Sequence, residues 1–277
     1  MNLLQAATLG AVEGLTEFLP VSSTGHLILA AHAMGLYSQV MNDFEIVIQG
    51  GALLAVLWLY RARALEALGG VARPNSPGRN LLLGLLVAFL PAAVLGLLLH
   101  HTIEEHLFGP RPVALALLLG GVVMVIFERR HRARGNTPRH ETVDAIPIRV
   151  AFLIGLFQCA SLWPGTSRSM VTILGGLLLG CSAVAAAEFS FLLALPTLGA
   201  ATLYGFLKSH GTLLSGAGVG PAAMLMGLAV AAVVAAIAIR TFIRWLTSHG
   251  LEPFGWYRIA LGITLLALLW THAGTGP

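Results

Sequence analysis

The chain has 277 residues, of which 57% are hydrophobic and only 10% are charged, and its mean hydropathy is +0.84. A soluble domain carries about 25% charged residues, so this composition excludes a soluble enzyme, a nucleic-acid binder and a disordered scaffold. The sequence therefore predicts an integral membrane protein. Its formal net charge of +4 is expected to lie in cytoplasmic loops rather than to indicate an acidic partner.

Six segments are predicted to cross the membrane, because a spanning helix needs about 20 mostly apolar residues. Together they predict one all-α membrane domain that covers residues 1–277. The six predicted transmembrane helices are residues 44–60, 81–99, 112–127, 189–207, 221–239 and 256–271.

Two further apolar regions do not have the pattern of simple spans. Residues 3–36 are interrupted by a run of Pro, Ser, Thr, Gly and His at 20–26, and residues 150–187 by a similar run at 163–169. Irregular backbone at membrane depth persists only where it is buried in protein or lines a water-filled cavity. Each region is therefore predicted to form a re-entrant helix–loop–helix hairpin.

The positive charges indicate an orientation. Most Lys and Arg residues fall in three predicted loops, 61–80, 128–149 and 240–258. By the positive-inside rule these loops are cytoplasmic, and both termini then face outward. The loop at 100–111 faces outward too, and its histidines indicate either a metal site or ordinary surface polarity.

The two halves of the chain resemble each other, with similar residues recurring about 145 positions later. Each half, about 1–130 and about 147–277, contains one broken hairpin and three spans. An odd number of crossings reverses the second half, which predicts an inverted-topology repeat whose hairpins meet near the bilayer midplane. The matches are Gly10 with Gly155, Glu13 with Gln158, Pro20-Val21-Ser22-Ser23 with Pro164-Gly165-Thr166-Ser167, Phe44 with Phe189, and Gly84 with Gly227.

Glu13 and Glu17 are functional candidates, because ionisable groups inside a membrane are costly. They are four residues apart, so on a helix they share a face and repel each other. A divalent cation between them, a proton on one of them, or a nearby Arg168 would stabilise the pair. The alternative is that each carboxyl group has only a buried hydrogen-bond partner.

Residues 22–26 combine three hydroxyls, a glycine and an imidazole. This pattern is typical of a hydroxyl nucleophile beside a general base. It is also compatible with hydroxyls that only satisfy backbone groups freed at a helix break. The candidates are Ser22, Ser23, Thr24, Gly25 and His26.

The second polar loop has the pattern of a phosphate cradle. Backbone N–H groups at a helix N-terminus bind anions, and Arg168 adds a forked cation that matches phosphate oxygens. The alternative is an Arg168–Glu17 pair with a structural role. The residues proposed to line the cradle are Gly165, Thr166, Ser167, Ser169 and Thr172.

At these residues the sequence resembles the bacterial undecaprenyl-diphosphate phosphatase family of the bacitracin-resistance type, over essentially the whole chain. The first family motif is found at residues 13–26, from Glu13 to His26, and the second at residues 164–172, from Pro164 to Thr172. The resemblance implies removal of the terminal phosphate from undecaprenyl diphosphate, which regenerates the lipid carrier for peptidoglycan and other envelope polymers. It also implies a bacterial inner-membrane location, an active site open to the periplasm and a metal-assisted reaction with Mg²⁺ or Ca²⁺.

The resemblance also implies roles for individual residues. Glu13 and Glu17 would hold the metal or position water, and Ser23 would be the nucleophile with His26 as its acid–base partner. Arg168, with Ser167 and Thr172, would bind the diphosphate and stabilise charge on the transferred phosphoryl group. A covalent phosphoserine and a direct attack by water both stay open, as does a homodimer.

The lipid tail is expected between spans, with Phe44, Phe189, Trp163 and Trp256 as candidate lining residues. A transporter or polyprenyl-phosphate flippase is the main alternative function, because broken helices in inverted repeats are also a transporter architecture. A membrane-embedded scaffold would leave the midplane ionisable residues without a role.

Overall fold

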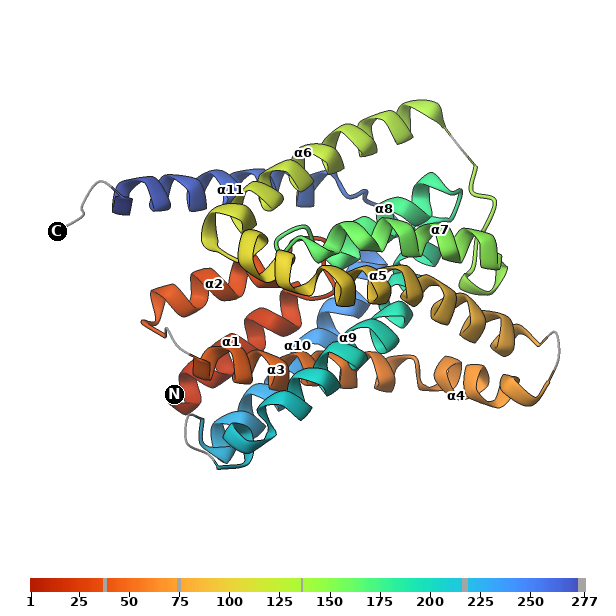
Figure 1. Cartoon of the computed structure of the whole chain (residues 1–277). Coiled ribbons are helices and arrows are strands. Elements are labelled where there is room, and N and C mark those ends of the chain that lie inside the picture. Colours follow the sequence, from red (N-terminus) through yellow and green to blue (C-terminus); the bar gives the residue numbers. More distant parts are fainter. Residues whose placement is uncertain (37–38, 74–75, 136, 216–218, 274–277) are drawn as a thin grey trace.

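The computed structural model describes residues 1–36, 39–73, 76–135, 137–215 and 219–273 (Figure 1). Helices make up the regular structure of these residues, apart from one isolated bridge between His140 and Cys181. The α-helices are α1 (Leu3–Thr16), α2 (Ser23–Ala33), α3 (Gln39–Leu59), α4 (Arg61–Gly69), α5 (Pro77–Leu107), α6 (Pro110–Arg134), α7 (Ile148–Gln158), α8 (Arg168–Leu178), α9 (Ala183–Ser215), α10 (Pro221–Leu246) and α11 (Glu252–Ala273). Short 3₁₀ turns are η1 (Gly70–Ala72), η2 (Val143–Ala145) and η3 (Cys159–Leu162).

The composition of these helices confirms an all-α membrane protein. Within the described residues, five helices are long and apolar enough to cross a bilayer, and a sixth span results if α3 and α4 count as one helix bent by 76°. Large apolar side chains point outward, such as Leu97 at 78% and Trp270 at 84% exposure. Such a surface is stable in lipid and not in water.

Several helix boundaries follow from proline. Pro77, Pro110 and Pro221 each lie in the first turn of a long helix, where the missing N–H costs no hydrogen bond. The helices that follow extend well beyond the predicted spans. The predicted loop at 61–80 is largely helical, since α4 and η1 occupy it.

Both polar runs interrupt helices, as expected. The first break separates α1 from α2, and the second separates α7 and η3 from α8. Ser22 (φ 71°) and Ser167 (φ 75°) are the described non-glycine residues with positive φ. Each serine caps the helix that follows, accepting a hydrogen bond from the N–H of Gly25 or Met170. The two breaks thus share an uncommon backbone conformation.

Helix packing also corresponds between the halves. Helix α1 packs on α10, and α7 packs on α5. A Cβ on Gly10 would clash with the backbone of Gly227, and one on Gly155 with the backbone of Ala88. The starts of α2 and α8 correspond, and they align Ser22 with Ser167. The sequence comparison had aligned Ser23 with Ser167, so the predicted alignment of this motif differs by one residue.

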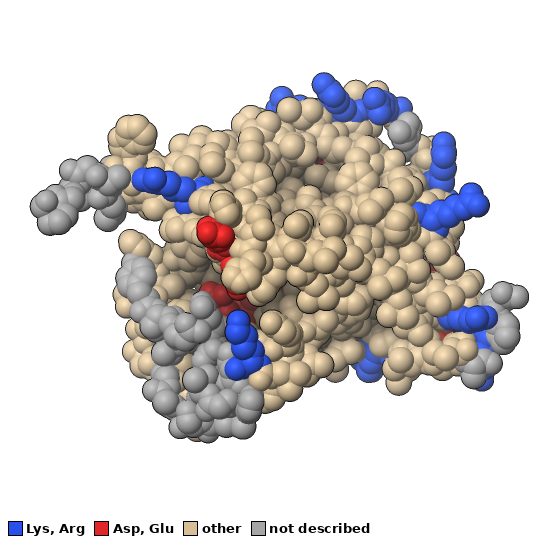
Figure 2. Space-filling model, viewed as in Figure 1, with Lys and Arg blue, Asp and Glu red and all other residues tan. Residues whose placement is uncertain are grey.

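The charges separate along the molecule. Figure 2 shows most of the visible Lys and Arg side chains at the end that carries α4 and the C-terminus of α6, away from the start of α1. We call this the arginine-rich end. Arg258 is an exception to the predicted loops: it belongs to α11 and is 0% exposed, so its assignment to a cytoplasmic loop was wrong.

Candidate active site

The two helix breaks meet at a buried ion pair. Glu17, directly after α1, and Arg168, the first residue of α8, are each 8% exposed. Their Oε1 and Nη2 atoms are 3.4 Å apart. Because an unpaired buried charge is strongly unfavourable, each side chain stabilises the charge of the other. The predicted proximity of Arg168 to the acidic pair is confirmed at Glu17.

The second oxygen of Glu17 binds the candidate nucleophile. Ser23 Oγ donates to Glu17 Oε2 at 2.6 Å. Since Oε1 faces Arg168, a single carboxylate connects the serine hydroxyl of the first break with the guanidinium of the second. Glu13, one turn earlier on α1, is 2% exposed and lies on the same side of that helix.

Hydroxyls hold the second loop in place. Ser169 Oγ donates to the carbonyl of Leu19 in the first break at 2.9 Å, and Ser167 Oγ lies 3.0 Å from Ser169 Oγ. Thr172 donates to Ser190 Oγ on α9 at 2.7 Å. Arg168 Nη1 donates to the Ser190 carbonyl at 2.8 Å, so α9 fixes the guanidinium from the far side. The sequence patterns did not predict a role for Ser190.

His26 has partners other than Ser23. Its Nδ1 lies 2.7 Å from the Ser22 carbonyl, and its Nε2 lies 2.7 Å from the Tyr257 hydroxyl on α11. A carbonyl only accepts, so Nδ1 carries the proton, and in the neutral ring Nε2 accepts from Tyr257. In this structure Ser23 is therefore hydrogen-bonded to Glu17, and His26 is hydrogen-bonded to Ser22 and Tyr257.

Arg258, beside Tyr257 on α11, joins the two breaks. Its guanidinium donates to the carbonyls of Pro20 at 3.3 Å, Gly165 at 3.0 Å and Ala116 at 3.2 Å. Its Nε is buried without a hydrogen-bond partner in the described protein. Arg258 seemed part of a basic loop because it follows Arg240 and Arg244 in the sequence. Its position directly after Tyr257, inside an apolar helix, was the only sequence signal that Arg258 does not belong to a loop.

The remaining predicted residues shape the loops. Gly165 has φ 94°, and a Cβ there would clash with the backbone of Val113. A Cβ on Gly25 would lie 2.7 Å from the Leu117 side chain. Thr24 and Thr166 are partly buried, and the Thr166 N–H donates to the carbonyl of Trp163.

An apolar groove of about 570 Å³ leads to the second loop. It runs between α5, α6 and α8, and Trp163 and Thr166 line it at the loop. Of the predicted tail-contacting residues, Trp163 therefore lines the groove. Phe44 and Phe189 are instead buried, at 0% and 2% exposure, and pack near Gly227 and Gly84. Trp256 lies beneath the Arg129 guanidinium.

The donor set determines what kind of metal site could form. Among the described residues, no cluster of three or more His, Cys, Asp or Glu side chains exists that could enclose a cation. Mg²⁺ is commonly bound by one or two carboxylates together with substrate phosphates. Glu13 and Glu17 fit that arrangement if the diphosphate supplies the other oxygens.

Known proteins match this chain over nearly its full length. The family model described as bacitracin resistance protein BacA matches residues 6–264. The undecaprenyl-diphosphatase of Sorangium cellulosum is 52% identical over 97% of this chain and 87% of its own length. Undecaprenyl-diphosphatase 1 of Chromobacterium violaceum is 46% identical over 97% of each chain. A relative of the same name from Thermoanaerobacter sp. is 43% identical over 96% of this chain and 97% of its own. On this evidence the chain belongs to the bacitracin resistance protein BacA family.

Proposed function

We propose that this membrane protein hydrolyses undecaprenyl diphosphate to undecaprenyl phosphate and inorganic phosphate, and so recycles the lipid carrier for envelope polymers. The names of relatives up to 52% identical support the reaction. The observation that carries the mechanism is the 2.6 Å hydrogen bond from Ser23 to Glu17, whose other oxygen meets Arg168. Headgroup transport is not favoured, because the curated relatives are named for hydrolysis.

In the first step Ser23 Oγ attacks the terminal phosphorus. Its proton passes to Glu17 Oε2, and the anhydride P–O bond breaks to release the lipid monophosphate. In the second step water attacks the phosphorus of the phosphoserine, Ser23 Oγ leaves with the proton held by Glu17, and inorganic phosphate departs with both protons of the water. General-base help of this kind contributes about 10²–10⁴-fold to a rate.

Arg168 is suited to stabilise the phosphoryl group. A guanidinium binds phosphate oxygens in a bidentate manner, and that of Arg168 is already fixed by Ser190 and Glu17. Preorganised charge of this kind requires no rearrangement during the reaction. The N-terminus of α8 adds backbone N–H groups directed at the same anion.

A divalent cation, Mg²⁺ or Ca²⁺, would be held by Glu13 and Glu17 together with the diphosphate. It would supply positive charge that lowers the repulsion between the carboxylates and the phosphate oxygens. His26, which contacts Tyr257 and the Ser22 carbonyl, would orient the first loop and exchange a proton with departing phosphate.

The arrangement in the membrane is also part of the proposal. The matched breaks at Ser22 and Ser167 and the paired packing of α1 with α10 and α7 with α5 support an inverted repeat with two re-entrant hairpins. The arginine-rich end would be cytoplasmic, in the inner membrane, with the site open to the periplasm. The lipid tail would occupy the apolar groove beside Trp163.

The test is phosphate release from undecaprenyl diphosphate by purified protein. Arg168→Lys is expected to reduce kcat/KM at least about 10²-fold, because Lys lacks the bidentate fork. The matched control Arg73→Lys, an exposed residue at the arginine-rich end, is expected to retain full activity. Wild-type protein without phosphate release would contradict the reaction. Full activity of Arg168→Lys would contradict the role of Arg168 alone.

The covalent step has its own measurement. Acid-quenched wild-type protein is expected to carry label from substrate labelled in its terminal phosphate, and Ser23→Ala is expected to carry none. Normal turnover by Ser23→Ala would show that water attacks directly.

A further inference from the structure

A second groove lies at the arginine-rich end, between the last turns of α6 and the end of α8. It has a volume of about 390 Å³, within the size range of ligand pockets. We call it the basic groove. Its lining residues are Val123, Ile126, Phe127, Arg130, His131, Arg134, Leu177 and Leu178.

The arginines on α6 differ in their partners. Arg129 pairs with Glu252 at 2.8 Å, and Arg132 pairs with Glu128 at 2.9 Å. Arg130 and Arg134, one turn apart and both lining the groove, form no ion pair with an acidic side chain among the described residues, unlike Arg129 and Arg132. The groove therefore presents two uncompensated guanidinium groups from one face of a helix.

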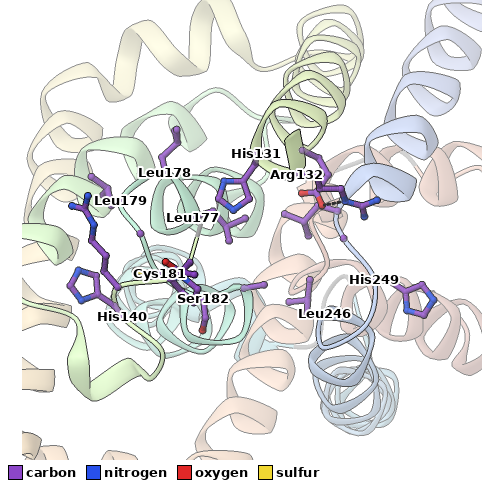
Figure 3. Close-up of a pocket in the computed structure, with 18 of the residues that line it drawn as sticks. His131, Arg132, His140, Leu177, Leu178, Leu179, Cys181, Ser182, Leu246 and His249 are labelled. Atoms are coloured by element: carbon purple, nitrogen blue, oxygen red, sulfur yellow. Dashed lines mark hydrogen bonds and ion pairs between the residues drawn. The ribbon is translucent and has the colours of Figure 1, made fainter. Parts of the chain in front are cut away.

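The wall beneath these cations is apolar and open. Val123, Ile126 and Leu178 are 54%, 47% and 54% exposed, as expected for side chains that face lipid. His131 extends the polar rim toward a larger cavity of about 970 Å³. Figure 3 shows this cavity, with His131 projecting from α6 toward Leu177 of α8. The basic groove is thus cationic at one end and apolar at the other.

We propose that the basic groove, which shares Val123, Phe127 and Leu178 with the apolar groove beside Trp163, binds an anionic phospholipid. The headgroup phosphate would accept hydrogen bonds from Arg130 and Arg134, and an acyl chain would lie on Val123, Ile126 and Leu178. Charge complementarity selects an anionic lipid over a zwitterionic one, because only a net negative headgroup balances two unpaired cations. Basic pockets between membrane helices bind phosphate headgroups in this way.

The test is native mass spectrometry of the detergent-purified protein titrated with dioleoyl phosphatidylglycerol. Replacing both Arg130 and Arg134 by Gln is expected to weaken binding of the first lipid at least about tenfold, since each arginine near a headgroup adds a favourable charge contact. The matched control replaces Arg61 and Arg73 by Gln. It removes the same charge from exposed positions near α4 and is expected to change binding less than about twofold.

Further arms identify the ligand. Ile126→Trp fills the basic groove at a position that does not line the apolar groove, changes no charge, and is expected to weaken lipid binding as well. Dioleoyl phosphatidylcholine is expected to bind at least about tenfold more weakly than phosphatidylglycerol, and millimolar inorganic phosphate is expected not to compete. Equal losses in the two double variants, equal affinity for both lipids, or full competition by phosphate would each overturn the proposal. Phosphate release by all variants is measured in parallel and reports separately on the hydrolytic site.

Discussion

Glu17 uses its two oxygens for two different partners, and this division makes its role testable. One oxygen accepts from Ser23 and the other faces Arg168. If Glu17 is the base for Ser23, Glu17→Gln and Ser23→Ala remove the same step. Each is expected to lower kcat by about 10²–10⁴-fold, and the double variant no further.

This non-additivity is measured by a double-mutant cycle on phosphate release. Glu66→Gln, an exposed carboxylate on α4, is the matched control and is expected to be silent. Additive losses would show that Glu17 acts through Arg168 or the metal rather than as the base for Ser23.

Tyr257 is expected to position His26 rather than to react. Tyr257→Phe removes the hydroxyl that meets His26 Nε2 at 2.7 Å but retains the ring that stacks on the imidazole. The variant is expected to lose about one hydrogen bond, or about 1 kcal/mol, which corresponds to a few-fold lower kcat. The pH profile is the deciding measurement, because it should shift only if the hydroxyl controls the protonation of His26. Tyr204→Phe, an exposed tyrosine of α9, is the control and should leave both kcat and the profile unchanged.

The residue scale also shows what sequence reasoning can predict. Glu13, Glu17, Ser23 and Arg168 were identifiable because charged or reactive groups inside apolar segments are costly. The partner of Ser23 was not, because spacing along the chain does not give side-chain direction. Arg258 was missed because it follows Arg240 and Arg244 and was counted with a basic loop. Ser190 was missed because a single serine in an apolar helix gives no signal, and its contact with Arg168 comes from a distant segment.

At the scale of elements, Ser22 and Ser167 determine how the chain enters the helix after each break. Both combine positive φ with a side chain that caps the next helix. Ser167→Gly is expected to be nearly neutral for stability, because glycine adopts this backbone without strain and replaces a cap at a cost of only a few tenths of a kcal/mol. Ser167→Val is expected to cost about 2 kcal/mol or more, since it combines a lost cap with a β-branched residue at positive φ.

Thermal unfolding in detergent compares the two Ser167 variants. Ser182, which caps the start of α9 and also donates to the Glu141 carbonyl, offers the control: Ser182→Val should lose these two hydrogen bonds without the strain of positive φ. Equal melting temperatures for Ser167→Gly and Ser167→Val would contradict a strained turn.

The elements themselves were predicted well where composition decides the outcome. Long apolar segments became helices near the expected positions, and both polar runs became breaks. Helix α4 was missed because its arginines resemble a loop, whereas alternating Arg, Ala and Leu residues have high helix propensity. The bend of 76° between α3 and α4 has no signal in the sequence that we can identify.

At the scale of the whole molecule, orientation is the property most open to direct measurement. In a protein whose Cys159 and Cys181 are replaced by Ser, we introduce Glu66→Cys at the arginine-rich end or Glu104→Cys near the end of α5. Both positions are about half exposed. If the arginine-rich end is cytoplasmic, an impermeant thiol reagent should label Glu104→Cys in intact cells and Glu66→Cys only after the cells are opened. The reverse pattern would invert the proposed topology.

Arg258 has a consequence for the motions this protein can make. One fully buried cation is bound to carbonyls of the first loop, the second loop and α6. Alternating access would require one half of the chain to rock against the other around the ligand. That movement would break the hydrogen bonds between Arg258 and these carbonyls. Hydrogen bonds to a charged group contribute about 1.5–3 kcal/mol each. The site between the two loops is therefore assembled before a substrate arrives. Such a site suits a reaction carried out in place better than the transport of a headgroup from one leaflet to the other.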